Sequence, residues 1–176
     1  MEKKYMDGVF VNNVTIVDVT PVYGGKEWQN EKYKDDVGLD IKLEIGQNFQ
    51  PVFYLGGRLK KDEFGEIKDP GSVRRVMSFF DAINMNPEFD NNYKLKDTDI
   101  LRDCVGREFM RLSYVSGKRD NGKLKYTDFQ QVVSASSQKR EIVDIFKTHV
   151  TNGWVKNYKP EVMESNAPGN DELSGW

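Results

Sequence analysis

The sequence of 176 residues contains one cysteine, Cys104, and one histidine, His149. A single cysteine cannot form an internal disulfide, and one Cys with one His cannot build a structural zinc site. No run of about 18 apolar residues occurs, and the N-terminus, MEKKYMDGVF, is charged where a signal peptide needs an apolar segment. We therefore expect a cytoplasmic protein that has no membrane span, holds no metal and needs no cofactor.

Motifs for catalysis are also missing. Acidic pairs such as Asp35 with Asp36 lie in polar segments, where solvated charges are expected. Neither a Gly-x-x-x-x-Gly-Lys phosphate loop nor a His-Glu-x-x-His helix is present. His149 falls on the apolar stripe of a predicted helix with no nucleophile pattern nearby, so we interpret it as structural. The sequence predicts a protein that is not an enzyme.

Aromatic residues, in contrast, are abundant, with ten Phe, eight Tyr and three Trp. Together with a hydrophobic content of 38% they suffice for the core of one domain. The net charge of -2 is unevenly distributed, because residues 161–176 contain four acids and no Lys or Arg. We therefore predict one domain over residues 1–160, followed by an acidic, disordered tail over residues 161–176.

Three segments predict β-strands by their alternation of apolar and polar residues, namely 8–25, 37–46 and 51–61. The strictest alternation is in the second segment, where one face is wholly apolar: Val37, Leu39, Ile41, Leu43 and Ile45. In the third, one face holds Phe53, Leu55 and Leu59, and the other holds Tyr54, Arg58 and Lys60. Gly56 and Gly57 predict a β-bulge that bends this third strand.

Later segments predict helices and a hairpin. Apolar residues at helical spacing predict a helix over residues 72–83 with Ser72 as its cap, and another over 138–150. Between them, 107–117 and 123–135 predict two strands that turn at Arg-Asp-Asn-Gly, where Asn-Gly supplies the positive φ of a tight turn. Six basic residues against two acids give residues 107–125 a local charge of +4.

This order of elements predicts the fold class. The expected fold is mainly β (α+β), a five-stranded OB-fold barrel with a helix between strands 3 and 4 and a C-terminal helix. OB folds bind oligonucleotides on the face of strands 2 and 3 and with the loops between strands 1 and 2 and between strands 4 and 5. The basic turn is then the loop between strands 4 and 5, where cations can hold phosphates while aromatic rings stack on bases.

The stretch VGREFMRLSYVSGKRDNGKLKYTDFQQVVSA, residues 105–135, has a Gly-Arg that opens a strand and a Gly-x-x-x-Tyr pattern after the turn. It resembles the closing hairpin of phage-encoded single-stranded DNA-binding proteins, and the similarity of layout extends over residues 8–135. The resemblance implies an OB fold that coats single-stranded DNA during replication, recombination or repair, in the host-cell cytoplasm. It also implies an acidic C-terminal tail that contacts replication or recombination proteins, although NDELSGW has fewer acids than the densest such tails.

We expect twelve residues to contact nucleic acid: Trp28, Tyr33, Lys42, Tyr54, Arg58, Lys60, Phe109, Arg111, Lys118, Arg119, Lys123 and Lys125. The tail residues expected to bind partners are Asp171, Glu172, Leu173 and Trp176. Tyr54 could instead be a half-buried sheet aromatic. Phe109 is expected to lean outward if Met110 and Leu112 face the core, or to be covered by the last helix.

A second function stays open at this point. A non-enzymatic β-barrel module for protein interaction, such as a phage assembly or host-takeover factor, would have the same element order. Salt separates the two hypotheses, because binding through phosphates weakens steeply as salt rises. The sequence also leaves a homo-oligomer open.

Overall fold

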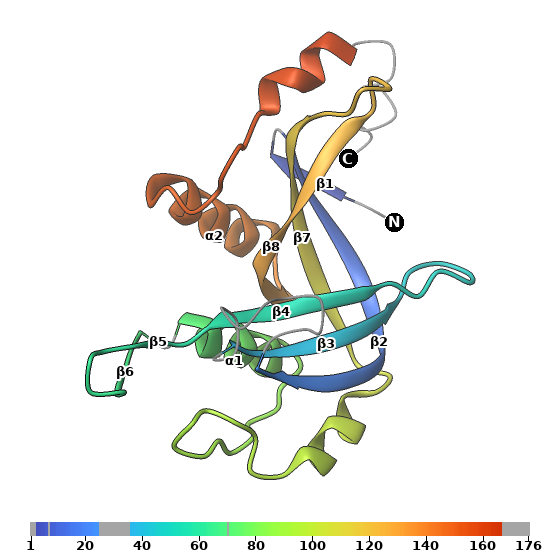
Figure 1. Ribbon diagram of the computed structural model, residues 1–176. Helices are drawn as coiled ribbons and strands as arrows, with labels where there is room; N and C mark the ends of the chain where they lie inside the picture. The colour runs from blue at the N-terminus through green and yellow to red at the C-terminus, as the bar shows by residue number, and fades with distance from the viewer. Residues whose placement is uncertain (1–2, 7, 25–35, 70, 167–176) are drawn as a thin grey trace. The chain divides into compact units, whose positions relative to one another are not determined.

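The computed structural model describes residues 3–6, 8–24, 36–69 and 71–166 (Figure 1). The chain divides into two compact units. Unit 1 consists of Met1–Asn13, Met110–Phe129 and Ala135–Trp176, and unit 2 of Val14–Phe109 and Gln130–Ser134. Three of the long strands pass from one unit into the other, so each of them contributes to two cores.

The described elements are β1 Lys3–Met6, β2 Val9–Tyr23, β3 Asp36–Glu44, β4 Val52–Arg58, β5 Lys60–Lys61, β6 Ile67–Asp69, α1 Gly71–Ala82, η2 Thr98–Cys104, β7 Glu108–Lys118, β8 Leu124–Ser134, α2 Lys139–Thr151 and η3 Pro160–Asn166. The main sheet has the order β4-β3-β2-β7-β8, with β1 paired to β2, and β5 pairs with β6 separately. A mainly β fold, with one helix between the third and fourth long strands and another after the fifth, is therefore confirmed.

The core of unit 2 forms because α1 and the sheet each present an apolar face. The alternation predicted for β3 is confirmed, since Val37, Leu39, Ile41 and Leu43 are all buried. On α1, Val76, Phe79 and Phe80 are buried against this sheet face. The helix begins at Gly71, so Ser72 lies within it and does not precede it as a cap.

Gly56 fits a close approach between β3 and β4 and does not form the predicted bulge. The two strands pair without a register shift from Asp36↔Arg58 to Lys42↔Val52, with Gly38 opposite Gly56. A Cβ atom on Gly56 would lie only 2.4 Å from both the Cα of Gly38 and the carbonyl oxygen of Val37. Glycine is needed here because the two backbones leave no room for a side chain.

The core of unit 1 is rich in aromatic rings. Tyr114 and Phe129 of the β7–β8 hairpin meet Phe146 of α2 and Tyr158, with Phe146 and Tyr158 centroids 5.0 Å apart. The predicted terminal helix is confirmed, and Ile142 and Phe146 are fully buried. Val150, in the last turn of this helix, is 43% exposed.

The folded chain continues past residue 160, where the sequence analysis placed the start of a disordered tail. Residues Pro160–Asn166 form η3, and Met163 is buried against Phe10 and Val115. The backbone N–H of Lys159 also donates to the carbonyl oxygen of Val115 at 3.0 Å. Residues 161–166 therefore belong to unit 1.

Candidate nucleic-acid interface

The β7–β8 hairpin places four cations around its turn. The N–H of Gly122 donates to the carbonyl oxygen of Arg119 at 2.9 Å, and the N–H of Arg119 donates to that of Lys123 at 2.8 Å. Gly122 has φ of 81°, which an L side chain adopts only with strain, so the Asn-Gly signal of the sequence is explained. The surrounding basic side chains are all exposed: Lys118, Arg119, Lys123 and Lys125.

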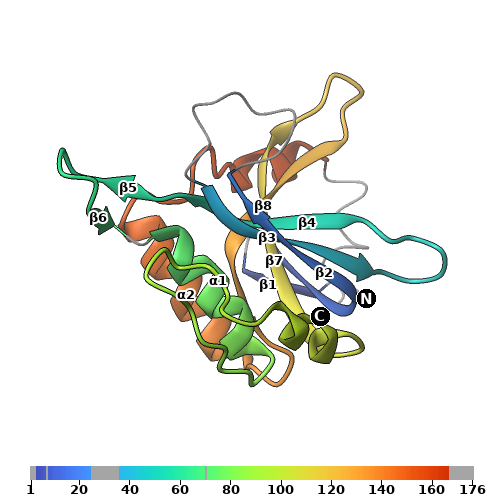
Figure 2. The same cartoon turned by 60° about the horizontal axis from the view of Figure 1, so that its bottom comes forward.

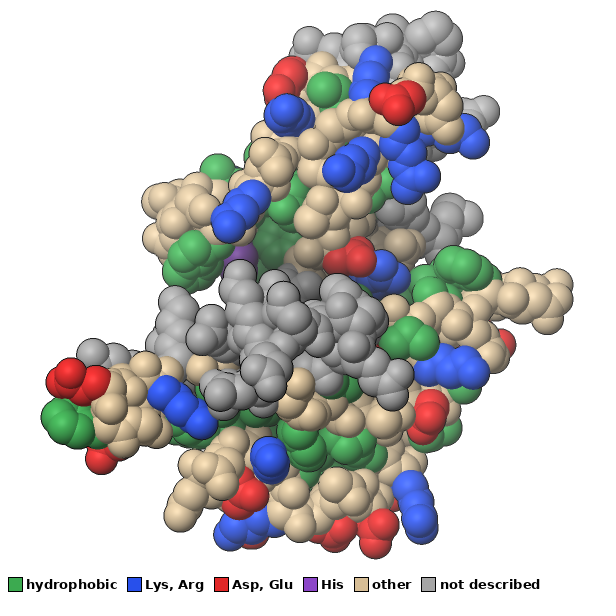
Figure 3. Space-filling view, viewed as in Figure 1, with side chains coloured by type: hydrophobic (Ala, Val, Ile, Leu, Met, Phe, Trp, Pro, Cys, Tyr) green, Lys and Arg blue, Asp and Glu red, His purple; other side chains and the backbone are tan. Residues whose placement is uncertain are grey.

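The segment after α2 adds two more cations to unit 1. Tyr114 donates its hydroxyl proton to the carbonyl oxygen of Lys156 at 2.9 Å, and Lys159 bonds to β7 through its backbone. The side chains of Lys156 and Lys159 are exposed. Figure 3 shows Lys and Arg side chains gathered over this part of unit 1.

Tyr126, the tyrosine of the Gly-x-x-x-Tyr pattern, is an exposed aromatic ring on the same hairpin and was not among the twelve expected contacts. It is 41% exposed, and its ring meets Phe10 edge-on with centroids 5.3 Å apart. Phe10 is buried, so it holds the Tyr126 ring from one side. The signal was available in the sequence, because Tyr126 lies directly after Lys125 and close to the turn.

Arg111 makes an ion pair within the hairpin. Its Nε donates to Oδ1 of Asp128 at 3.0 Å and its Nη2 to Oδ2 at 2.5 Å. The two side chains are only 20% and 35% exposed. A planar guanidinium held in this bidentate geometry fixes how β7 and β8 face each other, so Arg111 acts first as a structural residue.

The expectation that Phe109 leans outward is wrong. Phe109 is fully buried in the core of unit 2, where its ring contacts Phe79 at a centroid distance of 5.7 Å. The reason is that β7 leaves unit 2 at Phe109 and enters unit 1 at Met110. A strand that serves two cores need not keep one buried face, and Phe109 has no exposed surface for a base.

Lys42 of β3 and Tyr54 of β4 lie on the face of these strands opposite the buried residues Ile41 and Phe53. Lys42 is exposed there, but its cross-strand neighbour on β2 is Asp18. Tyr54 lies opposite Asp40, and its ring covers Gly38, where a Cβ would be 2.7 Å from a ring carbon. Tyr54 is therefore a partly buried ring that packs on the sheet.

Several predicted site residues lie outside the described part of the molecule. Trp28 and Tyr33 fall in residues 25–35, and the tail residues Asp171, Glu172, Leu173 and Trp176 in residues 167–176, none of which the structure describes. For Arg58 and Lys60 it describes the backbone without the side chain.

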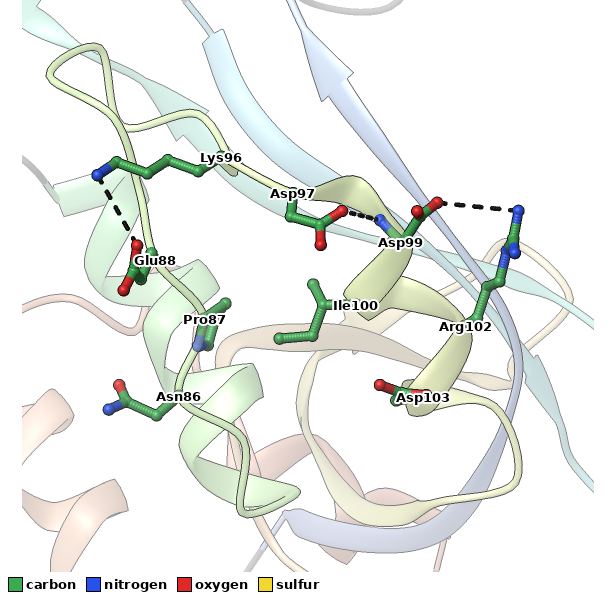
Figure 4. Close-up of a pocket in the computed structure, with 9 residues that line it drawn as sticks. All are labelled: Asn86, Pro87, Glu88, Lys96, Asp97, Asp99, Ile100, Arg102 and Asp103. Carbon is green, nitrogen blue, oxygen red and sulfur yellow. Dashed lines mark hydrogen bonds and ion pairs between the residues drawn. The ribbon is translucent and has the colours of Figure 1, made fainter.

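A pocket of about 640 Å³ lies in unit 2 beside η2 (Figure 4). Four of the charged groups that line it form ion pairs, Lys96 with Glu88 and Arg102 with Asp99, each at 3.8 Å and largely exposed. Oδ1 of Asp97 accepts the N–H of Asp99 at 2.9 Å. Within the described residues no group of three or more His, Cys, Asp or Glu side chains is placed to hold a metal.

Comparison with known proteins gives no evidence on function, so a functional assignment depends on the hairpin. No protein-family model matches the chain, and no curated protein matches it. Among the described residues, no helix has the length and apolar character needed to cross a membrane.

Proposed function

We propose that this protein binds single-stranded DNA with little sequence preference, and that the β7–β8 hairpin of unit 1 is its main contact surface. In this role it coats and protects single strands during DNA replication, recombination or repair, in phage-infected cells. The observation that carries the proposal is the group of exposed cations at the hairpin turn together with the exposed ring of Tyr126. Cations track phosphates and rings stack on bases, and neither contact reads sequence.

The distribution of charge supports the choice of unit 1. Unit 1 contains twelve Lys and Arg against ten Asp and Glu, a net charge of +2, and four of those acids lie in residues 161–176. Unit 2 contains fourteen Lys and Arg against eighteen Asp and Glu, a net charge of -4. A polyanion is therefore attracted to unit 1 and repelled by unit 2.

The strand order supports an OB-type fold. β2, the first long strand, lies between β3 and β7, and the final hairpin places β8 at the end of the path. The order of the long strands is thus third, second, first, fourth and fifth, which is the path along an OB barrel. We propose that the hairpin turn corresponds to the loop between strands 4 and 5 of that fold.

The first test reverses the charge of Lys118, Arg119 and Lys123 together by substitution with Glu. Anisotropy of a fluorescein-labelled oligo-dT strand, measured at several salt concentrations, gives the affinity and its salt slope. If three phosphate contacts are lost, the affinity at 0.1 M salt falls about a hundredfold and the slope becomes shallower by about 2. The matched control reverses Lys61, Arg74 and Arg102, three exposed cations of unit 2, and retains most of the affinity.

A second arm of this test separates stacking from charge. Tyr126→Ala and Tyr126→Leu should both weaken binding, by about 1–3 kcal/mol if one base stacks there, and leave the salt slope unchanged. Tyr126→Leu keeps an apolar contact with Phe10, so its melting temperature should stay close to that of the wild type. A loss of affinity in this variant then reports the loss of the aromatic ring and not a loss of folding. Equal loss of affinity in the hairpin variant and in its control, or equal affinity for duplex DNA, would contradict the proposal.

The alternative function, a module for protein interaction, rests on a different observation. Large apolar side chains are exposed on both units, among them Phe64 at 82% and Trp154 at 63%. Contacts through such side chains depend less on salt than contacts through phosphates.

A further inference from the structure

The β5–β6 hairpin of unit 2 presents Phe64 on an ordered tip. Oδ1 of Asp62 accepts the N–H groups of both Phe64 and Glu66 at 2.9 Å, and the N–H of Asp62 donates to the carbonyl oxygen of Glu66 at 2.8 Å. These bonds hold the turn in one conformation while the Phe64 side chain is 82% exposed. Figure 2 shows this hairpin extending beyond the end of β4.

The same tip is acidic. Residues 62–66, Asp-Glu-Phe-Gly-Glu, contain three acids and no cation, and Glu63 and Glu66 are both exposed. In the space-filling view, acidic side chains surround an apolar one at the end of this hairpin (Figure 3). A surface that receives this tip needs an apolar contact for the ring and cations around it.

Unit 1 carries such a surface at the C-terminal end of α2. Trp154 is 63% exposed and Val150 is 43% exposed, and His149 lies beside them with its ring centroid 5.2 Å from that of Trp154. The backbone N–H of Trp154 donates to the carbonyl oxygen of His149 at 2.9 Å. This bond holds the backbone of Trp154 next to the end of the helix. Figure 3 shows apolar side chains beside the histidine.

The charge of this surface is opposite to that of the tip. Residues 145–160 contain three lysines and no Asp or Glu. Lys147 lies one helical turn before Val150, Lys156 follows Trp154 by two residues, and both side chains are exposed. Within this segment the acidic tip therefore meets lysines and no carboxylate, while the nearest acids in the sequence are Asp144 and Glu161 at its two ends.

We infer that the acidic Phe64 tip of one molecule docks on the Trp154 surface of a second copy. The two surfaces lie on different units and differ in sequence, so each molecule has one of each. Such a heterologous, head-to-tail contact can repeat from copy to copy and produces an open chain unless the rotation closes a ring. An open chain is what cooperative coating of a DNA strand would use. The contact itself needs no DNA and is independent of the proposed function.

The experiment is sedimentation velocity over a range of concentrations without DNA. The wild-type protein should associate progressively, and more weakly at high salt, since opposite charges meet in the interface. Phe64→Ala and Trp154→Ala should each lower the association constant at least about tenfold, as truncation of a buried aromatic anchor does. Both side chains are exposed in the monomer, so the melting temperature should be unchanged.

Mixing the two variants gives the sharpest readout. Phe64→Ala keeps the Trp154 surface and Trp154→Ala keeps the Phe64 tip, so an equimolar mixture should form dimers and stop there. A charge exchange is the second check. One double variant carries Glu63→Lys and Glu66→Lys, and the other carries Lys147→Glu and Lys156→Glu. Neither double variant should associate alone, but a mixture of the two should associate. Exposed Val105→Ala serves as a control that leaves association unchanged.

The inference would be overturned by a wild-type protein that sediments like Phe64→Ala at every concentration, or by a mixture of variants that gains no dimer. It would also fail if both variants assembled like the wild type. Binding of each variant to an oligo-dT strand short enough for one molecule reports on the proposed function separately, and this affinity should be unchanged in Phe64→Ala.

Discussion

The thiol of Cys104 is enclosed in the core of unit 2. Its side chain is fully buried, with Sγ 3.7 Å from Sδ of Met85 and 3.9 Å from the carbonyl oxygen of Ile100. Burial, slightly offset by the nearby Arg107, raises the pKa of the Cys104 thiol to about 11 from an ordinary value of 9.0. The thiol is therefore protonated at neutral pH and behaves as a small apolar side chain.

This raised pKa predicts a loss of stability at alkaline pH. Below pH 9 the thiol is protonated in both the folded and the unfolded chain and contributes no pH dependence. Between about pH 9 and 11 the unfolded chain releases the proton while the folded chain retains it, so the free energy of unfolding falls as pH rises. Urea denaturation across this range should show the stability difference between wild type and Cys104→Ala shrinking with pH.

The comparison with Cys104→Ala isolates the thiol from other groups. Burial also raises the pKa values of Tyr23 and Tyr114, so both proteins should lose stability at high pH. The cavity left by the substitution adds a constant offset. Stability curves that stay parallel from pH 8 to pH 11 would show that the thiol pKa is not raised.

The pairing of β3 with β4 depends on two glycines that face each other. Gly56 cannot accept a Cβ because the backbone of Val37 and Gly38 lies 2.4 Å away. At Gly38, a Cβ would meet the ring and the hydroxyl of Tyr54 at 2.7 and 2.8 Å. The Tyr54 ring thus occupies the space that a side chain at position 38 would need.

Gly56→Ala should therefore separate these strands. We expect it to lower the free energy of unfolding by about 3 kcal/mol or more, because backbone atoms must move to admit the methyl group. The matched control is Gly65→Ala, at a positive φ of 80° but with nothing within 4 Å of the added Cβ, which should cost about 1 kcal/mol. Equal melting temperatures for the two variants would contradict the steric argument.

At the scale of the whole molecule, the two units carry net charges of opposite sign. A basic unit that includes the hairpin and an acidic unit that includes η2 and the β5–β6 tip occur in one chain. The C-terminal residues follow η3 and so begin at the basic unit. Any negative charge they carry is tethered near the surface proposed for DNA, at an effective concentration set by the tether.

Two truncations test this arrangement. A chain that ends at Asn166 loses Asp171 and Glu172 but keeps η3, so its melting temperature should be unchanged and its affinity for oligo-dT should rise at 0.01 M salt, where the Debye length is ~30 Å. A chain that ends at Pro160 also loses Met163, whose burial contributes about 1.5–3 kcal/mol, and should melt at a lower temperature. Identical affinity of full-length and Asn166-terminated chains at low salt would indicate an inert tail.

Local signals in the sequence were sufficient for most elements. The alternation of β3, the helical spacing in α1 and α2 and the Asn-Gly turn of the hairpin each depend on neighbouring residues, and the structure confirms them. Exposure of the cations around the turn was equally predictable, because a hairpin tip projects from its sheet. The short strand β1 and the pairing of β5 with β6 were not predicted, since strands this short have no periodicity to detect.

The remaining features depend on contacts between residues far apart in the chain. Sequence alone determined a mainly β fold with two amphipathic helices and a basic hairpin, since hydrophobic periodicity and turn chemistry act over a few residues. Tertiary structure decided that Phe109 is buried, that Arg111 pairs with Asp128 and that Met163 belongs to a core. The physical reason is that β7 crosses between two cores. Which side of a strand is buried then depends on the elements that pack against it at each point, and periodicity within the strand cannot supply that information.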